Sequence, residues 1–534
     1  MKKRLPSLII AVLLVIFCTL AVTQRPQVFY PMVKVETADP SGNLTLSSLF
    51  HSRPTLQGCE AINGNISRVL LSACPQCRIT QIQCLNKLDE TQQTWLTADA
   101  LPTASGQMAN GIVLYDSTNT ELALSTCQAS EKQSASGQNP IKCFPANATR
   151  TKPAPPSVLS PWTLALLFTA FAAAWFVGWL IVKYEHLHAH LSHDHVDSGP
   201  QKYHTEPTPR IGGLAVMIGL LAALATTVLV ENPPNSALST QHSALNFGLL
   251  LLAGIPAFLG GLVEDVTKKV GVLERLLLTM LAGSLAAWLL GAVLNRLDVP
   301  GLDQAMLWLP FAVAFTVFAV GGIANAINII DGYNGLAGGF AVIVLAALAY
   351  IAYLVGDSLI FTVALALTGA LLGFLAWNWP GGKIFLGDGG AYLLGFLLAE
   401  LSVLLVARNP EVSPWLPLLF LIYPVFETFF SIYRRKLKHG LSPGQPDNMH
   451  MHQLIHDNII QRGERTCTSG TNHCVAKYLW IPAIATSMLG VIFWQSTAAL
   501  ISFAVAYCIF YVVSYRQIAR LMAVPAEFEE RNAT

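Results

Sequence analysis

A succession of long apolar segments occupies the chain from residue 161 to residue 515, and it constrains the fold more than any other feature. Each segment has about 17–23 residues, which is enough for a helix to cross a hydrocarbon core of ~30 Å. Charged residues make up 12% of the chain, whereas soluble domains have about 25%. The sequence therefore predicts an all-α polytopic membrane module. We expect about 11 spans, at about 161–183, 211–230, 245–263, 276–294, 308–324, 336–355, 359–378, 391–407, 414–433, 477–495 and 498–515.

The residues before this module divide into two parts. Residues 1–23 begin with Lys2, Lys3 and Arg4 and continue as an apolar run, which predicts a signal anchor or a signal peptide. Residues 24–160 contain no apolar run of that length and are rich in polar residues, so we expect an exported domain. The membrane module then occupies 161–515, and a tail occupies 516–534. The net charge of +1 creates no attraction for a polyanion, so no nucleic-acid partner is expected.

Six of the ten cysteines lie in the predicted exported domain. An even number of cysteines in an exported segment predicts disulfides, whose connectivity the sequence leaves open. A zinc site built from Cys74, Cys77 and Cys84 is the alternative. Short alternating runs at 79–85 and 111–115 predict a small β-rich fold. In contrast, Cys467 and Cys474 fall in a loop on the other side, where we expect free thiols. The exported cysteines are Cys59, Cys74, Cys77, Cys84, Cys127 and Cys143.

The Lys and Arg residues of the loops are unevenly distributed. If 24–160 lies outside, alternation of the spans leaves only Arg296 and Arg408 in short outer loops. The remaining basic residues fall in loops on the inner side, which agrees with the positive-inside rule. Nearly all groups that could perform chemistry lie in five loops on that same side. This one-sidedness favours a catalytic face over a transport path, which would place charged residues near the bilayer midplane.

Two of the five loops carry basic and histidine residues suited to phosphate. The first contains Lys202, His204 and Arg210 beside prolines that hold the backbone extended; a basic anchor at the membrane edge explains the same residues. The last contains His450 and His452, for which phosphate binding fits better than a metal pair, because no acid or Cys stands at the usual spacing. A further run of histidines at 186–195 either binds a transition metal or extends the preceding helix into solvent.

The other three loops carry carboxylates and amides. Glu264 and Asp265 are adjacent at a helix end, which is unfavourable unless a cation or the neighbouring lysines neutralise them. Asn328, Asp331 and Asn334 lie in a glycine-punctuated segment that can bind hydroxyls, a metal or an amide-bearing sugar, or form a structural turn. Asp388 lies between glycines just before a predicted helix, where backbone amides suit phosphate and the carboxylate suits magnesium. Phe385 precedes it and could stack on a base.

The five loops, in this order, resemble the polyprenyl-phosphate N-acetylhexosamine-1-phosphate transferases, which form glycosyltransferase family 4. The resemblance covers about 161–465 and omits the exported domain. The matching patterns are H-x-x-P-T-P-R-x-G-G at 204–213, an acid pair at 264–265, N-A-x-N-x-x-D-G-x-x-G-L at 325–336, F-x-G-D-x-G at 385–390 and S-P-x-x-P-D-x-x-H-x-H at 442–452.

The resemblance implies a reaction and a location. It implies transfer of a sugar 1-phosphate from a UDP-N-acetylhexosamine to undecaprenyl phosphate, release of UMP and a need for Mg²⁺, with Mn²⁺ as an alternative. It further implies a multi-pass protein of the bacterial inner membrane with a cytoplasmic active site, a periplasmic segment 24–160, and a role in the first step of a cell-surface polysaccharide. The partners would be the two substrates, membrane lipid and, as a candidate assembly, a second copy.

The resemblance also implies roles for individual residues. Asp331 and Asp388 match magnesium or catalytic carboxylates, Asp265 matches the second residue of the family's acid pair, and Glu264 the first. Three positions depart from the family: Glu264 and Asn334 stand where Asp is usual, and Gln453 replaces a histidine. A lipid-linked-sugar transporter or flippase, and an inactive relative acting as a scaffold, are the rival interpretations. The remaining matched positions, implied to contact substrate, are Lys202, His204, Arg210, Asn328, Asn378, His450 and His452.

Overall fold

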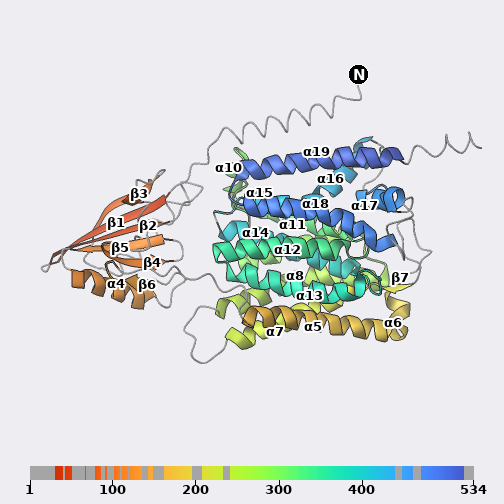
Figure 1. Cartoon of the computed structure of the whole chain (residues 1–534), viewed down its shortest axis with the longest axis horizontal. Helices are drawn as coiled ribbons and strands as arrows, with labels where there is room; N and C mark the ends of the chain where they lie inside the picture. The colour runs from red at the N-terminus through yellow and green to blue at the C-terminus, as the bar shows by residue number, and fades with distance from the viewer. Residues whose placement is uncertain are drawn as a thin grey trace, which may run out of the picture. The chain divides into compact units, whose positions relative to one another are not determined.

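The structure is a computed structural model of the whole chain (Figure 1), and it divides into two compact units, Thr23–Pro155 and Pro156–Thr534 with Met1–Val22. The predicted signal anchor at 1–23 lies outside the described residues. The structure describes residues 30–39, 42–50, 67, 78–85, 91–92, 95, 101–108, 111–117, 120–134, 142–147, 161–194, 207–231, 241–409, 411–438, 440, 448–460 and 471–521.

The smaller unit contains a six-stranded antiparallel sheet in the order β3-β1-β2-β5-β4-β6. Successive side chains of a strand point to opposite faces, so the neighbours Met32 and Val33 of β1 belong to different apolar clusters. Helix α4 contributes Cys127 to the cluster that contains Val33. The β-rich prediction is confirmed. The elements are β1 (Tyr30–Asp39), β2 (Gly42–Phe50), β3 (Arg78–Leu85), β4 (Ala104–Met108), β5 (Gly111–Ser117), α4 (Thr120–Ser134) and β6 (Lys142–Phe144).

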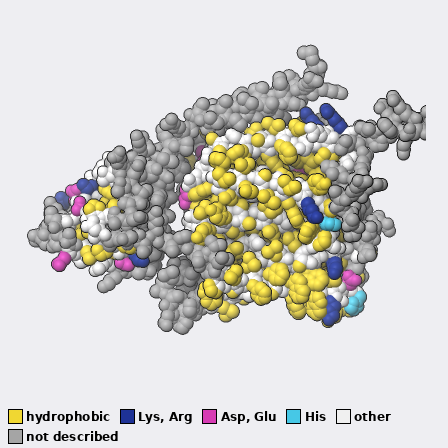
Figure 2. Space-filling model, in the orientation of Figure 1, with side chains coloured by type: hydrophobic (Ala, Val, Ile, Leu, Met, Phe, Trp, Pro, Cys, Tyr) yellow, Lys and Arg dark blue, Asp and Glu magenta, His cyan; other side chains and the backbone are white. Residues whose placement is uncertain are grey.

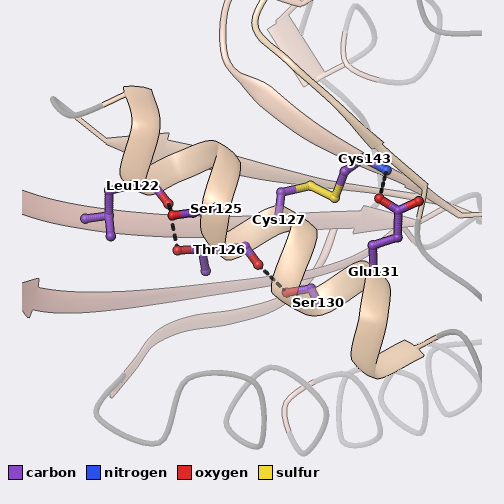
Figure 3. The surroundings of a disulfide bond; sticks show 7 residues. All are labelled: Leu122, Ser125, Thr126, Cys127, Ser130, Glu131 and Cys143. Atoms are coloured by element: carbon purple, nitrogen blue, oxygen red, sulfur yellow. Dashed lines mark hydrogen bonds between the residues drawn. A yellow bond between two sulfur atoms is a disulfide. The ribbon is translucent and has the colours of Figure 1, made fainter.

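A disulfide between Cys127 and Cys143 joins α4 to β6 (Figure 3). Beside it, the backbone N–H of Cys143 donates to the Glu131 carboxylate at 3.3 Å. Cys84 is also disulfide-bonded, so the zinc alternative, which required its thiolate, is wrong. Cys474 is disulfide-bonded as well, and the expectation of a free thiol there is wrong. That expectation came from the cellular compartment alone, whereas pairing depends on which thiols the fold brings together.

The larger unit is a helical bundle. Ten helices in its described part are long and apolar enough to cross a membrane. Hydrophobic side chains cover much of the face of this unit that Figure 2 shows, and large apolar residues such as Phe168, Trp288 and Ile481 are exposed. This confirms the polytopic fold class. The ten are α5 (Pro161–Lys183), α7 (Gly212–Glu231), α8 (Gln241–Thr267), α9 (Val272–Leu290), α11 (Leu309–Ile330), α12 (Leu336–Val355), α13 (Ser358–Asn378), α14 (Gly387–Arg408), α18 (Cys474–Ile492) and α19 (Thr497–Leu521).

The ninth predicted span, 414–433, is interrupted. It consists of α15 (Trp415–Phe420) and α16 (Ile422–Ile432), which meet at Leu421. Pro424 explains the break, because it has no N–H to bond the carbonyl four residues earlier and its ring crowds that carbonyl. Beyond α16 the chain continues as a short π-helix, Tyr433–Lys438.

Shorter elements complete the unit. The helix α6 (Glu185–Ser192) ends before His193, which pairs instead in the two-residue strand β7 (His193–Asp194) with β8 (Thr208–Pro209). The histidines at 186–195 therefore do not share one helix. The others are α10 (Leu302–Met306), α17 (Met451–Ile455), a π-helix at His456–Ile460 and a 3-10 helix at Thr471–His473.

Helix α14 is the centre of the bundle. Every residue from Gly387 to Val406 is buried, which means that neighbouring helices surround it on all sides. Its N-terminal end lies with the C-terminal ends of α8 and α11 and the N-terminal end of α9, as the hydrogen bonds below establish. We call this end of the bundle, which also includes the N-terminal end of α7, the site end.

Candidate active site

Backbone hydrogen bonds join the first and fourth motif loops at the site end. The Phe385 N–H donates to the Pro209 carbonyl at 2.8 Å, and the Gly212 N–H donates to the Phe385 carbonyl at 2.9 Å. Gly387, at the start of α14, has a φ of +74°, and a Cβ there would lie 1.9 Å from the Arg210 carbonyl oxygen. Only glycine permits this approach. The glycines of the fourth motif therefore let the chain carrying Arg210 reach the N-terminal end of α14.

Asp388 is the point at which the motifs converge. Arg210 donates to its carboxylate at 3.2 Å and Asn328 at 3.1 Å. Arg275, near the start of α9, donates to the second carboxylate oxygen, and its guanidinium lies 5.7 Å from the centroid of the Tyr392 ring. Side chains from three other segments thus bond one buried carboxylate. Because two guanidinium groups surround it, the centre is suited to anionic ligands as well as to a cation.

Asp265 holds the start of α14. Its two carboxylate oxygens accept the backbone N–H groups of Asp388 and Gly389, both at 2.9 Å. These amides belong to the first turn of the helix, which has no internal partners for them. Asp265 is 1% exposed and lies 3.7 Å from Arg210. The carboxylate therefore caps α14 from another helix and positions Asp388, whereas sequence reasoning assigned it to the catalytic group itself.

Glu264 faces a different way. Its carboxylate accepts the Val270 N–H at 2.7 Å, and its carbonyl accepts the N–H of Lys268. The side chain thus closes the turn between α8 and α9. A catalytic role for Glu264 stays a prediction that depends on its match to the family pattern. In the structure its carboxylate stabilises this turn.

Asn328 and Asp331 lie at the C-terminal end of α11. Asn328 reaches Asp388, as described above, while Asp331 ends the helix and is half-buried. Among the described residues, none donates a hydrogen bond to the Asp331 carboxylate. Burial raises the pKa of Asp331 to about 7, against the opposing effect of the Arg210 guanidinium, and the Asp265 carboxylate adds to the rise. Asp331 is thus an available oxygen ligand close to Arg210.

The donor set fits magnesium. No group of three or more His, Cys, Asp or Glu side chains is gathered for a metal within the described part of the chain. Mg²⁺ does not require such a group, since it is usually held by one or two carboxylates together with water and substrate phosphates. Asp331 and Asp388 are the two carboxylates that suit this role, because Asp388 is bonded by side chains that a ligand can displace, whereas the oxygens of Asp265 accept backbone amides of α14.

Asn334 and Asn378 hold the loops of the site together. Asn378 accepts the Gly335 N–H at 2.7 Å and donates to the Ile384 carbonyl at 2.8 Å. Asn334 donates to the Pro380 carbonyl at 3.2 Å. These bonds connect the third and fourth motif loops. Direct substrate contacts by the two amides, and base stacking by the half-buried Phe385, stay predictions.

The histidine motif packs against the third loop. His450 and His452 stack with ring centroids 5.4 Å apart and planes 5° apart. The His452 ring lies edge-on to Tyr333 at 5.6 Å, and its Nε2 is 3.6 Å from where a Cβ on Gly332 would lie. The histidines therefore adjoin the loop that begins at Asp331. Lys202 and His204, predicted to bind phosphate, lie outside the described residues.

Sequence reasoning missed two residues of the site end, Arg275 and His456, and left the role of a third, Glu427, open. Nothing in the sequence around Arg275 distinguishes this arginine from the nearby lysines. His456 contacts Tyr333 with centroids 5.3 Å apart, and its spacing of four from His452 on a helix was an available signal. Glu427 is a carboxylate within a predicted span, which is by itself a sign of function, but the sequence did not show what it contacts.

Comparison with known proteins agrees with this arrangement. Residues 247–406 match the family model for glycosyl transferase family 4. The chain is 33% identical over 261 residues to a probable undecaprenyl-phosphate N-acetylglucosaminyl 1-phosphate transferase of Bacillus subtilis, covering 48% of this chain and 67% of that protein. The chain belongs to glycosyl transferase family 4.

Two further relatives are also similar to this chain. A decaprenyl-phosphate N-acetylglucosaminephosphotransferase of Mycolicibacterium smegmatis is 29% identical over 351 residues, covering 59% of this chain and 80% of that protein. A phospho-N-acetylmuramoyl-pentapeptide-transferase of Clostridium perfringens is 27% identical over 254 residues, covering 47% and 76%. The family-model match contains Asp265, Asp331 and Asp388, whereas Arg210 and the histidine motif lie outside it.

Proposed function

We propose that this glycosyl transferase family 4 member transfers an N-acetylhexosamine 1-phosphate from its UDP derivative to undecaprenyl phosphate and releases UMP. Two of the three names contain both a polyprenyl phosphate and N-acetylglucosamine, which supports this acceptor and this class of sugar. The convergence of Arg210, Arg275 and Asn328 on Asp388 is the observation that carries the proposal, since it joins cationic donors and a carboxylate in one place.

The chemistry requires little more than such a centre. An oxygen of the lipid phosphate attacks the β-phosphorus of the UDP-sugar, a new P–O bond forms, and the bond from that phosphorus to the oxygen of UMP breaks. UMP departs with the electron pair of the broken bond. A phosphate monoester has a second pKa near ~6, so at neutral pH the nucleophile is already charged. The protein has mainly to align two anions and neutralise them.

Asp331 and Asp388 would hold Mg²⁺ in this proposal. The bound ion would neutralise charge on the diphosphate of the donor. The guanidinium groups of Arg210 and Arg275 can each donate two hydrogen bonds to phosphate oxygens. In the structure they donate to different carboxylate oxygens of Asp388. We therefore assign them to the diphosphate. Asp265 would hold the N-terminal end of α14 in place while Asp388 exchanges its arginine partners for Mg²⁺.

The location of the site supports a further part of the proposal. We propose that the site end faces the cytoplasm at a bacterial inner membrane and that residues 24–160 are periplasmic, which the uneven distribution of Lys and Arg supports. A polyprenyl-diphospho-sugar formed on that face would be the first lipid-linked intermediate of an envelope polysaccharide.

The experiment offers purified protein undecaprenyl phosphate, magnesium and a panel of UDP-sugars, and it measures UMP together with the lipid product by mass spectrometry. UMP release with at least one UDP-N-acetylhexosamine is expected, and Asp388→Asn is the inactive control. A folded protein that releases no UMP with any donor would leave the transporter and scaffold alternatives in its place.

A further inference from the structure

A buried tyrosine ring lies beside the arginine of α9 that contacts Asp388. Tyr392 of α14 is 2% exposed, and the guanidinium carbon of Arg275 lies over its ring, 5.7 Å from the centroid. A guanidinium within about 6 Å of an aromatic centroid is attracted by the negative face of the ring. Asp388 and Tyr392 are four residues apart in α14, so their side chains lie on one face of the helix. Arg275 thus contacts two successive positions of that face.

Helix α11 holds the Tyr392 ring in place. The Tyr392 hydroxyl donates to the side-chain oxygen of Asn325 at 3.4 Å, and the Asn325 NH₂ group donates to the Gly321 carbonyl at 2.8 Å. The second bond uses the donor end of the amide, which leaves its oxygen for the hydroxyl. Asn328, three residues further along α11, donates to Asp388. One helix therefore holds both the carboxylate and the ring that contact Arg275.

The two contacts of the Arg275 guanidinium respond differently to a metal. In the proposed function the Asp388 carboxylate binds Mg²⁺ and leaves Arg275, whereas a tyrosine ring does not compete for a cation that prefers oxygen ligands. Arg275 belongs to the first turn of α9, where the helix dipole disfavours a positive charge. Its Nε–H donates to the Gly271 carbonyl at 3.4 Å. Among the contacts of the described residues, this bond and the Tyr392 ring are the ones that persist when Asp388 turns to the metal.

We propose that Tyr392 is a positioning residue for the nucleotide-sugar donor: its ring keeps the Arg275 guanidinium next to Asp388, where it binds the diphosphate of that substrate. This inference rests on the proposed function, which assigns Arg275 to the diphosphate. Tyr392 itself touches no substrate and acts only through the guanidinium. The alternative is a purely structural role, in which Tyr392 does no more than fill space between α14 and α11.

The variant Tyr392→Met distinguishes the two roles, because methionine fills irregular space in a core but has no aromatic ring. Calorimetric titration with UDP in the presence of magnesium measures binding of a diphosphate. We expect Tyr392→Met to bind UDP about 5–30-fold more weakly, the range for a cation–π contact removed from bulk water. KM for the UDP-sugar should rise accordingly, and KM for undecaprenyl phosphate should stay unchanged. Tyr392→Phe keeps the ring and should recover most of the lost affinity.

Phe396→Met is the matched control. Phe396 is fully buried one turn further along α14, and its ring packs on α8 at Gly254. The substitution therefore removes a buried aromatic ring of the same helix that has no contact with Arg275. This variant should bind UDP as tightly as wild type, and melting temperatures in the same detergent show whether the two Met variants are equally stable.

A double-mutant cycle with Arg275→Met makes the test sharper. If Tyr392 acts through Arg275, the double variant should bind UDP no more weakly than Arg275→Met alone. Losses that multiply in the double variant, an equal loss in Phe396→Met, or no recovery in Tyr392→Phe would establish a structural role and overturn the inference. A wild type that binds UDP but releases no UMP would contradict the proposed function, while the UDP affinities would still test Tyr392. A wild type that does not bind UDP would contradict both.

Discussion

Replacing Asp265 by Asn tests whether the adjacent carboxylates at 264 and 265 have different tasks. In the wild type, each oxygen of Asp265 accepts one N–H of the first turn of α14, at 2.9 Å. Asn has only one oxygen, so one of these amides would face an N–H₂ group instead. The carboxylate is 1% exposed, so water cannot replace the lost acceptor. The variant should therefore displace the start of the helix that carries Asp388.

The size of the effect follows from the lost hydrogen bond. A hydrogen bond to a charged group contributes about 1.5–3 kcal/mol, and the upper value applies here because the second donor is left unsatisfied. If the competent arrangement of Asp388 becomes about 3 kcal/mol less favourable, its population falls about 100-fold. The transfer rate should fall by at least that factor. Glu264→Gln changes only a bond to Val270, so we expect a loss of about 10-fold at most, which corresponds to about 1.4 kcal/mol.

The assay is the initial rate of UMP release at saturating magnesium, with wild type, Asp265→Asn and Glu264→Gln purified to the same monodispersity. Melting temperatures, measured in the same detergent, separate loss of the cap from general unfolding. Turnover of Asp265→Asn within about threefold of wild type would refute the capping argument, given the magnitude expected for a preorganised charge. An equal loss in Glu264→Gln would show that the two acids act as one pair.

Three further predictions address the metal, the pH and the disulfide. Asp388→Asn should reduce turnover at least as far as Asp265→Asn and raise the magnesium concentration needed for half-maximal rate, which a magnesium titration measures. At limiting magnesium, the rate should fall as the pH decreases through about 7, because burial raises the pKa of Asp331 to about 7 and protonation removes this metal ligand. Saturating magnesium should shift this decrease in rate to lower pH. A pH dependence that does not change with magnesium concentration would contradict the assignment. Mass spectrometry after alkylation without reduction should leave Cys127 and Cys143 unmodified, whereas labelling of both would contradict the pairing.

The order of the membrane segments followed from the sequence alone. A span requires a continuous apolar run, which is a local property, and ten of the predicted runs are long apolar helices in the structure. The interruption at Leu421 was also encoded locally, by Pro424, but hydropathy does not register a missing N–H. The polar residues of the loops could also be identified from the sequence. A polar residue that follows an apolar run is recognisable without any knowledge of how the helices pack.

Only the tertiary structure decided what these residues do. Asp265 and Glu264 are neighbours in sequence, yet one caps α14 across more than a hundred residues and the other closes its own turn. The pairing of Cys127 with Cys143 was one of many open combinations until α4 and β6 were placed side by side. Glu427 became a partner of His450 because the fold brings α16 to the residue that precedes α17. Hydrogen bonds act over about 3 Å, so their partners are set by the packing of helices, and hydropathy along the chain contains no record of that packing.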